Sequence, residues 1–195
     1  MAGNIATTGQ VMQVAKIKRS HVFGASGSGA TTLAKAISET FGYHFIDTDD
    51  IFWEQTDPPF TKRRPAALAL KGLQKAIALN EHVVISGAFV GWGDSVKPAI
   101  DLFVFLHLPL SIRLERIKKR EYHRFGARVL AGGDLYEQHL SFLEWVSAYE
   151  IGDVNMRSKR QHETWLADVK VPIIRITEPL PLTDMIKLIE PHLGR

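Results

Sequence analysis

Short apolar runs alternate along the chain with segments in which apolar residues recur every three or four positions. The runs predict strands, and the three- to four-residue periodicity predicts helices. The expected strands are 17–23, 43–46, 83–85, 102–106 and 171–176, and the expected helices are 30–40, 66–79, 110–122, 134–149, 158–166 and 183–189. Strands that alternate with helices are typical of a parallel sheet covered on both faces. Pro172 predicts that the last strand lies at a sheet edge.

Composition is that of a globular domain. Of the 195 residues, 45% are hydrophobic and 23% are charged, with a formal net charge of +3 and no cysteine. We expect residues 1–16 to be a disordered leader and 17–195 to be a single domain. No membrane partner is expected, because no apolar run approaches ~18 residues and the N-terminus lacks signal-peptide character. The slight positive charge does not argue for nucleic acid, the lack of cysteine fits a cytoplasmic location, and the oligomeric state is not predicted.

A glycine-rich stretch, Gly24-Ala25-Ser26-Gly27-Ser28-Gly29-Ala30-Thr31-Thr32, joins the first expected strand to the first helix. Strand, glycine turn and helix are the context of the phosphate-binding loop G-x-x-x-x-G-K-[ST]. Its backbone N–H groups and the positive helix end can hold phosphates, and Thr31 lies where Mg²⁺ is bound. One position departs from the pattern, since Ala30 replaces the lysine. The alternative is an ordinary strand-to-helix turn. The expected nucleotide-binding residues here are Gly24, Ser26, Gly27, Ser28, Gly29, Ala30, Thr31 and Thr32.

Acidic residues follow the second expected strand, in the sequence Asp47-Thr48-Asp49-Asp50. In open parallel sheets, ligands bind outside the carboxyl ends of the strands. A carboxylate there can hold Mg²⁺ or accept a proton from a substrate hydroxyl. The alternative is helix capping or a solvated loop. After the third strand, residues 86–94 combine three glycines with two aromatic rings, which suits either a flat ligand or a core-filling turn.

Arginines recur along the helix expected after the fourth strand. Arg113, Arg116 and Arg120 share one helix stripe, and Arg124 and Arg128 lie beyond it. Converging arginines would neutralise charge that develops during phosphoryl transfer. The alternative is a solvated helix face.

Several of these stretches together resemble the nucleoside-monophosphate kinase and shikimate/gluconate kinase branch of P-loop proteins. The resemblance rests on residues 24–32, 46–49, 83–87 and 104–120, and it is specific at the P-loop. More closely, the chain resembles a bacterial adenylate kinase-like set, also labelled AAA-family ATPase, in which the P-loop lysine is missing. The motifs similar to that set are Trp53, 56–60, 91–94 and 132–134.

The resemblance implies a three-layer P-loop NTPase fold with a five-stranded parallel sheet, ATP and Mg²⁺ as cofactors, and a lid at about 120–133. It implies that Arg116 and Arg120 contact the nucleotide. It also implies that Asp47 binds Mg²⁺ together with Thr31. By the same resemblance, Asp49 is expected to interact with the acceptor hydroxyl, and Gly87 is expected to lie against the acceptor.

We therefore expect an ATP-dependent phosphotransferase acting on a nucleotide or a small hydroxyl-bearing metabolite, whose identity the sequence does not give. Arg120 or Arg124 from the lid, or Arg63 or Arg64 from the loop after the second strand, would replace the missing lysine. The residues expected at the acceptor are Asp49, Arg63, Arg64, Gly87 and Trp92, and those expected in catalysis are Asp49, Arg120 and Arg124. The alternative is a nucleotide-binding sensor or interaction protein with little turnover, which the alanine at position 30 favours.

Overall fold

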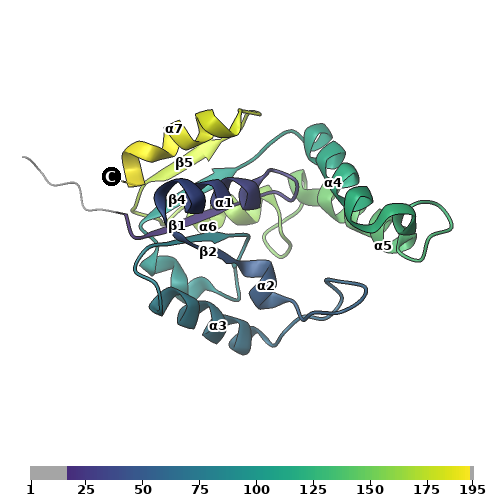
Figure 1. Cartoon of the computed structure of the whole chain (residues 1–195), viewed down its shortest axis with the longest axis horizontal. Coiled ribbons are helices and arrows are strands. Elements are labelled where there is room, and N and C mark those ends of the chain that lie inside the picture. The colour runs from purple at the N-terminus through teal and green to yellow at the C-terminus, as the bar shows by residue number, and fades with distance from the viewer. Residues whose placement is uncertain (1–16, 194–195) are drawn as a thin grey trace, which may run out of the picture.

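A parallel sheet with the strand order β2-β3-β1-β4-β5 forms the centre of the protein (Figure 1). The structure is a computed structural model and describes residues 17–193, so the predicted leader at 1–16 lies outside the described residues. The strands are β1 (Arg19–Gly24), β2 (His44–Asp47), β3 (Val83–Ser86), β4 (Leu102–Leu106) and β5 (Ile173–Ile176). Every pairing is parallel, and β5 lies at an edge, as its proline predicted.

Helices cover both faces of the sheet and extend beyond one end of it (Figure 1). They are α1 (Ala30–Phe41), α2 (Thr48–Phe52), α3 (Ala66–Ala78), α4 (Leu110–Phe125), α5 (Tyr136–Ser147), α6 (Lys159–Leu166) and α7 (Leu182–Leu193). Three short 3-10 turns are also described, η1 (Asp94–Ala99), η2 (Gly126–Val129) and η3 (Ala148–Glu150). The predicted three-layer α/β architecture with a five-stranded parallel sheet is confirmed for residues 17–193.

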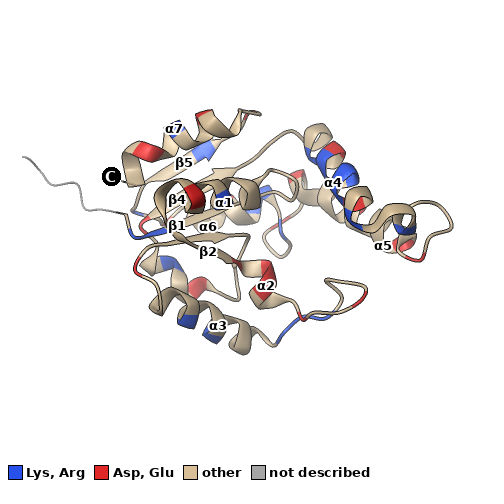
Figure 2. Ribbon diagram, viewed as in Figure 1, with Lys and Arg blue, Asp and Glu red and all other residues tan. Residues whose placement is uncertain are grey.

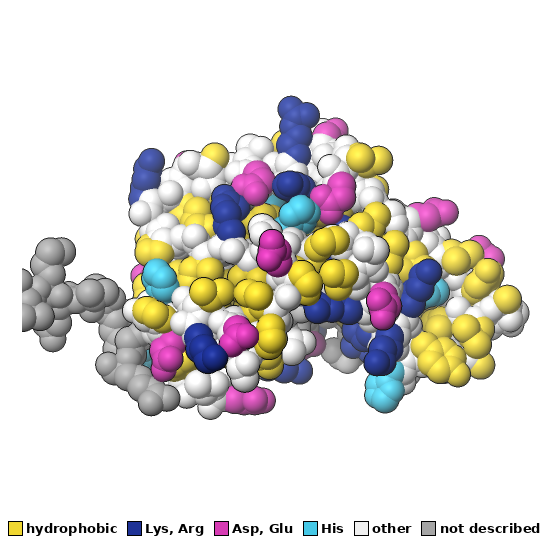
Figure 3. Space-filling model, turned by 90° about the horizontal axis from the view of Figure 1, so that it is seen from above, with side chains coloured by type: hydrophobic (Ala, Val, Ile, Leu, Met, Phe, Trp, Pro, Cys, Tyr) yellow, Lys and Arg dark blue, Asp and Glu magenta, His cyan; other side chains and the backbone are white. Residues whose placement is uncertain are grey.

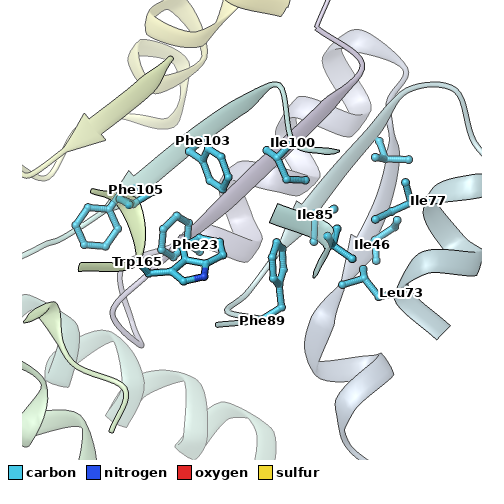
Figure 4. Packing of buried hydrophobic residues seen from close by; sticks show 13 residues of the cluster. Phe23, Ile46, Leu73, Ile77, Ile85, Phe89, Ile100, Phe103, Phe105 and Trp165 are labelled. Carbon is cyan, nitrogen blue, oxygen red and sulfur yellow. The ribbon is translucent and has the colours of Figure 1, made fainter. Parts of the chain in front are cut away.

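Two hydrophobic clusters hold the layers together. In β1, Val22 packs with α1 and α7, whereas the next residue, Phe23, packs with α3 and α6. Successive strand side chains point to opposite faces, so a strand covered on both sides is continuously apolar. Figure 4 shows Phe23 beside Trp165 of α6, with ring centroids 5.5 Å apart. This packing fixes β1, and therefore the loop that follows it, in the middle of the molecule.

The element boundaries differ from the predictions where capping or turn chemistry decides them. Helix α2 was not predicted, because it is only five residues long and starts from an aspartate cap. Helix α4 runs on to Phe125 and ends before Gly126, whose φ of 58° few other residues adopt readily. The helix expected over 134–149 is shorter and ends in η3. Strand β5 starts at Ile173, just after Pro172.

Helices α4 and α5 project from the sheet as a separate arm (Figure 1). Basic residues are frequent along α4 (Figure 2), and exposed apolar side chains such as Tyr122 and Leu130 lie on the same arm. In the view from above, Lys and Arg side chains gather where this arm meets the body, and hydrophobic side chains gather at its end (Figure 3). Within residues 17–193, no helix has the length and apolar character needed to cross a bilayer.

Candidate active site

The predicted P-loop connects β1 to α1 at the carboxyl edge of the sheet, and glycines are required in it. A Cβ on Gly24 would lie 1.9 Å from the Leu106 carbonyl oxygen, and one on Gly27 would lie 2.7 Å from that of Arg113. Gly29, with a φ of 98°, sits immediately before α1, so Ala30 is the first residue of that helix. The loop therefore passes close behind β4 and α4 and opens at the positive end of α1, where anions bind readily.

One hydroxyl inside this loop has no partner among the described residues. Ser28 is 2% exposed, and its Oγ is buried without a hydrogen bond. A buried hydroxyl that lacks a partner is costly, and a phosphate oxygen would accept its hydrogen bond. The loop thus fits the phosphates of a nucleotide.

Two hydroxyl side chains are in contact beside the start of α1, and a carboxylate is the strand neighbour of one of them. The Oγ1 of Thr31 lies 3.0 Å from the Oγ of Ser86, which ends β3, and Asp47 of β2 is the register partner of Ser86. Hydroxyl and carboxylate oxygens are ligands that suit Mg²⁺. Within residues 17–193, no group of three His, Cys, Asp or Glu side chains could hold a metal alone. The site therefore fits an Mg²⁺ that is shared with nucleotide phosphates.

Asp47 also caps a helix, so helix capping, the alternative that the sequence left open for these aspartates, is partly confirmed. Its Oδ1 accepts a hydrogen bond from the backbone N–H of Asp49 at 3.0 Å, at the start of α2. Burial raises the pKa of Asp47 to about 6, with the charges of Asp49 and Asp50 adding to the rise and that of Lys35 opposing it. The cap leaves its second oxygen available.

The acceptor-side residues lie next to this group. Asp49 is exposed in the first turn of α2. Gly87 has a φ of 90°, and a Cβ there would lie 2.2 Å from the Thr48 hydroxyl, so local packing alone requires glycine. Its carbonyl oxygen accepts a hydrogen bond from the Nε2 of His21 at 2.6 Å. The predicted acceptor role of Gly87 remains a prediction.

The alternative of a solvated helix face is wrong for Arg113, the first arginine of α4. Arg113 is fully buried, because this face of α4 packs against the P-loop. Its guanidinium donates to the carbonyl oxygens of Leu108 at 2.9 Å and Ser26 at 3.4 Å, and to the carboxylate of Glu150 at 2.7 Å. Arg113 therefore braces the P-loop from behind.

Arg116, one turn further along α4, also lies beside the P-loop. Its Nη1 donates to the carbonyl oxygen of Ser28 at 3.3 Å. Although Arg116 is exposed, it is placed next to the loop that would hold the nucleotide. This position suits the predicted nucleotide contact, which the geometry alone does not test.

The other predicted arginines contact rings or nearby polar groups. Arg120 pairs with Glu121 at 3.2 Å, and the guanidinium of Arg124 lies 5.7 Å from the ring of Phe60. Among residues 17–193, neither forms a hydrogen bond or ion pair with the P-loop. The remaining contacts are those of Arg63 with the rings of Phe52 and Trp53, Arg64 with the Ile51 carbonyl, Arg128 with Asp134 and Asp57, and Trp92 with the ring of Phe52.

Sequence reasoning missed one cation at this site. Arg157 lies between α5 and α6, and it lines a narrow hollow together with Ser26 of the P-loop, Arg113 and Tyr149. Its charge interacts with those of Asp49 and Arg63. The sequence contains no motif around this residue, and its position depends on how α5 and α6 pack.

Comparison with known proteins places the chain in a family. It is 40% identical over 177 residues to the uncharacterised protein YqaC of Bacillus subtilis, a match that covers 91% of this chain and 98% of YqaC. The chain belongs to the YqaC family. No family model matches it.

More distant similarities of this YqaC-family protein are to kinases. It is 32% identical over 117 residues to cytidylate kinase of Pyrococcus horikoshii, which covers 51% of the chain and 56% of that enzyme. A sugar kinase from Janibacter sp. shares the fold at 19% identity, with a TM-score of 0.52 over 91% of the chain and 94% of that kinase. Shikimate kinase of Bacteroides thetaiotaomicron is 16% identical, with a TM-score of 0.51 over 89% of the chain and 98% of that kinase. These similarities support a kinase-type enzyme with a P-loop fold.

Proposed function

We propose that this YqaC-family protein transfers the terminal phosphoryl group of ATP to a nucleotide or to a small hydroxyl-bearing metabolite. The observation that carries the proposal is the contact of Thr31 with Ser86, the register partner of Asp47, beside the P-loop, with Asp49 in the first turn of α2. The kinases to which the chain is similar support the same reaction class. The partial length of the cytidylate kinase match leaves the acceptor open.

On the nucleotide side, the backbone of residues 24–29 and the start of α1 would hold the phosphates. The free hydroxyl of Ser28 would donate to one of them, and Arg116 would lie along the nucleotide. The oxygens of Thr31 and Asp47 would hold Mg²⁺ together with the phosphates. When bound, that ion withdraws charge from the phosphoryl oxygens.

On the acceptor side, Asp49 would orient the attacking hydroxyl and accept its proton. The carboxylate is exposed, and its position at the start of α2 is set by the cap on its own backbone N–H. Phe52 and Trp92, stacked with centroids 5.3 Å apart, and Arg63 near the Phe52 ring would form the wall against which the acceptor lies. The lid arginines Arg120 and Arg124 would close over both ligands once these are bound.

The deciding experiment combines binding with product detection. Calorimetric titration of the protein with ATP and Mg²⁺ should show saturable binding. Incubation with ATP and a panel of nucleoside monophosphates and hydroxyl-bearing metabolites should then yield ADP only with the correct acceptor. Absence of nucleotide binding would reject the P-loop assignment. Binding without ADP formation across the panel would favour the second candidate below.

The second candidate is a nucleotide-dependent sensor or interaction protein, and the alanine at position 30 favours it. A cation on transferring phosphoryl groups contributes on the order of 10³–10⁵ in rate when supplied as an arginine finger. A binding protein has no need of that contribution. Single-turnover measurement separates the two candidates, since a sensor would keep bound ATP intact over minutes.

A further inference from the structure

Ala30 leaves the start of α1 without the positive charge that this loop pattern carries. Lys35 does not replace it, because its Nζ lies over the ring of Phe45, 5.6 Å from the centroid. Arg113 does not replace it either, because its guanidinium is fully buried and bonded to Leu108, Ser26 and Glu150. Neither of these two residues therefore supplies the missing charge.

Arg157 is placed differently from these residues. It lines the hollow next to Ser26 of the P-loop, and its guanidinium lies 5.4 Å from the ring centroid of Trp145. Among residues 17–193, its side chain has no hydrogen bond or ion pair. Burial lowers its pKa, the charge of Asp49 opposes this shift, and the charge of Arg63 adds to it. A guanidinium that is partly desolvated and unpaired is a binding site for an anion.

The backbone around Arg157 is held in place before any ligand arrives. Ser158 caps α6 by accepting a hydrogen bond from the N–H of Gln161 at 3.0 Å, and its hydroxyl donates to the carbonyl oxygen of Asp153 at 2.5 Å. Asp153 in turn accepts from the N–H of Asn155 at 2.8 Å. Residue 157 is thus fixed by the turn on one side and by α6 on the other. Little ordering would be needed when it binds an anion.

We propose that Arg157 is the phosphate-binding cation that replaces the P-loop lysine, reaching ATP from the segment between α5 and α6. This inference rests on the proposed phosphotransferase function. It assigns the role to a side chain that lines the same hollow as Ser26 of the P-loop. The charge is supplied in the ligand-free fold and does not wait for the lid.

The test measures MgATP affinity by calorimetry in the full chain for wild type, Arg157→Gln and Arg160→Gln. Arg160 is an exposed arginine three residues away on α6, which makes it a matched control. We expect Arg157→Gln to weaken MgATP binding by roughly 10- to 100-fold, the range for a lost charged hydrogen bond, and Arg160→Gln to leave it unchanged. The double variant Ala30→Lys/Arg157→Gln should regain most of the lost affinity.

The outcomes separate this inference from the proposed function. If wild type binds MgATP and Arg157→Gln binds it equally well, the role of Arg157 is rejected and the function stands. If wild type binds no nucleotide, both are rejected. Thermal unfolding of the ligand-free variants shows whether they are folded. If Arg157→Gln is unfolded, the affinity of Arg157→Lys, which keeps the charge, is measured in its place. A loss of affinity that Ala30→Lys fails to restore would mean that Arg157 is structural, and it would overturn the inference.

Discussion

Two arginines that line the hollow beside Ser26 of the P-loop are held in opposite ways. Arg113, behind the loop, is completely buried and donates to two carbonyl oxygens and the carboxylate of Glu150. Arg157 lies against the Trp145 ring without a hydrogen bond or ion pair in the described part of the chain. The same residue type therefore stabilises the fold at one position, and at the other it is the residue that we propose to bind phosphate.

The aspartates at the end of β2 show a second contrast of this kind. Asp47 is partly buried and caps α2, whereas Asp49 is exposed and its carboxylate is not used in the cap. We expect the residues with saturated contacts to hold the site in shape and those with free groups to contact ligands. The four predictions below test that division.

The largest effect is expected for the free carboxylate. Asp49→Asn keeps size and hydrogen bonding but removes the charge, so turnover should fall by ~10²–10⁴ while ATP affinity barely moves. Steady-state kinetics and calorimetry measure the two quantities. Asp50→Asn, an exposed neighbour in the same helical turn, is the control and should keep its rate. A normal rate for Asp49→Asn would leave Asp49 without a catalytic role.

Arg113, on the saturated side, should affect stability. Arg113→Met removes the guanidinium and leaves the carbonyl oxygens of Leu108 and Ser26 without this donor, which costs about 1–3 kcal/mol of the free energy of unfolding. Urea denaturation measures this loss. Lys118→Met, an exposed change on the same helix, should stay within about 0.5 kcal/mol. Equal stability of the two variants would remove Arg113 from the bracing role.

His21, within β1, should make stability depend on pH. Burial lowers its pKa from 6.5 to about 3, although the hydrogen bond to Gly87 opposes the shift. Below pH 6.5 the unfolded chain binds a proton that the folded chain does not. The free energy of unfolding is therefore at its full value above pH 6.5. Between pH 6.5 and pH 3 it falls by about 1.4 kcal/mol per pH unit for each such group.

Denaturation at pH 7, 6 and 5 measures that slope. His21→Phe should reduce it by the contribution of one proton. His162, whose pKa burial also lowers to about 3, offers a second variant with the same expectation. An unchanged slope in His21→Phe would show that His21 is protonated in the folded protein.

The smallest effect is expected at Thr31. Its hydroxyl is one of several oxygens around the proposed Mg²⁺, so Thr31→Ala should weaken the Mg²⁺-dependent part of ATP binding about tenfold, as for one lost charged contact. ATP titrations in the presence of Mg²⁺ and in the presence of a chelator separate the Mg²⁺-dependent part of binding from the rest. Thr31→Ser keeps the hydroxyl and should bind like wild type. If Thr31→Ala retains the full dependence on Mg²⁺, Thr31 is not a ligand.

Features that depend on local chemistry could be predicted from the sequence. The apolar runs and the glycines of the P-loop located β1, the turn and α1 to within a residue or two. The strand order was not predicted, because it depends on long-range pairing. Gly27 and Gly29 are required by the local backbone conformation, since their φ values of 82° and 98° strongly favour glycine. The edge position of β5 followed from a single proline.

Features that depend on tertiary packing could not be predicted. The spacing of Arg113 placed it correctly on the stripe of Arg116, but spacing does not say which part of the stripe α4 buries against the P-loop. Arg157 lay in a stretch without motif, and only the packing of α5 and α6 brings it to Ser26. Helix α2 was missed because the cap by Asp47 that starts it is a contact between an aspartate and a backbone N–H, which apolar periodicity does not report.

The central position of β1 has a consequence for how the chain folds. The strand at residues 19–24 pairs with β3 at 83–86 and β4 at 102–106, and the arginine proposed to complete the phosphate site is at position 157. During synthesis, the first strand therefore has no partner until β3 has been made at residues 83–86, and it lacks its second partner until β4 at 102–106. Folding dominated by such distant pairings is slow, and an early apolar strand stays exposed for that time. Truncation at the lid would remove Trp165, which packs against Phe23 of β1, together with the arginine that we propose for the phosphate site.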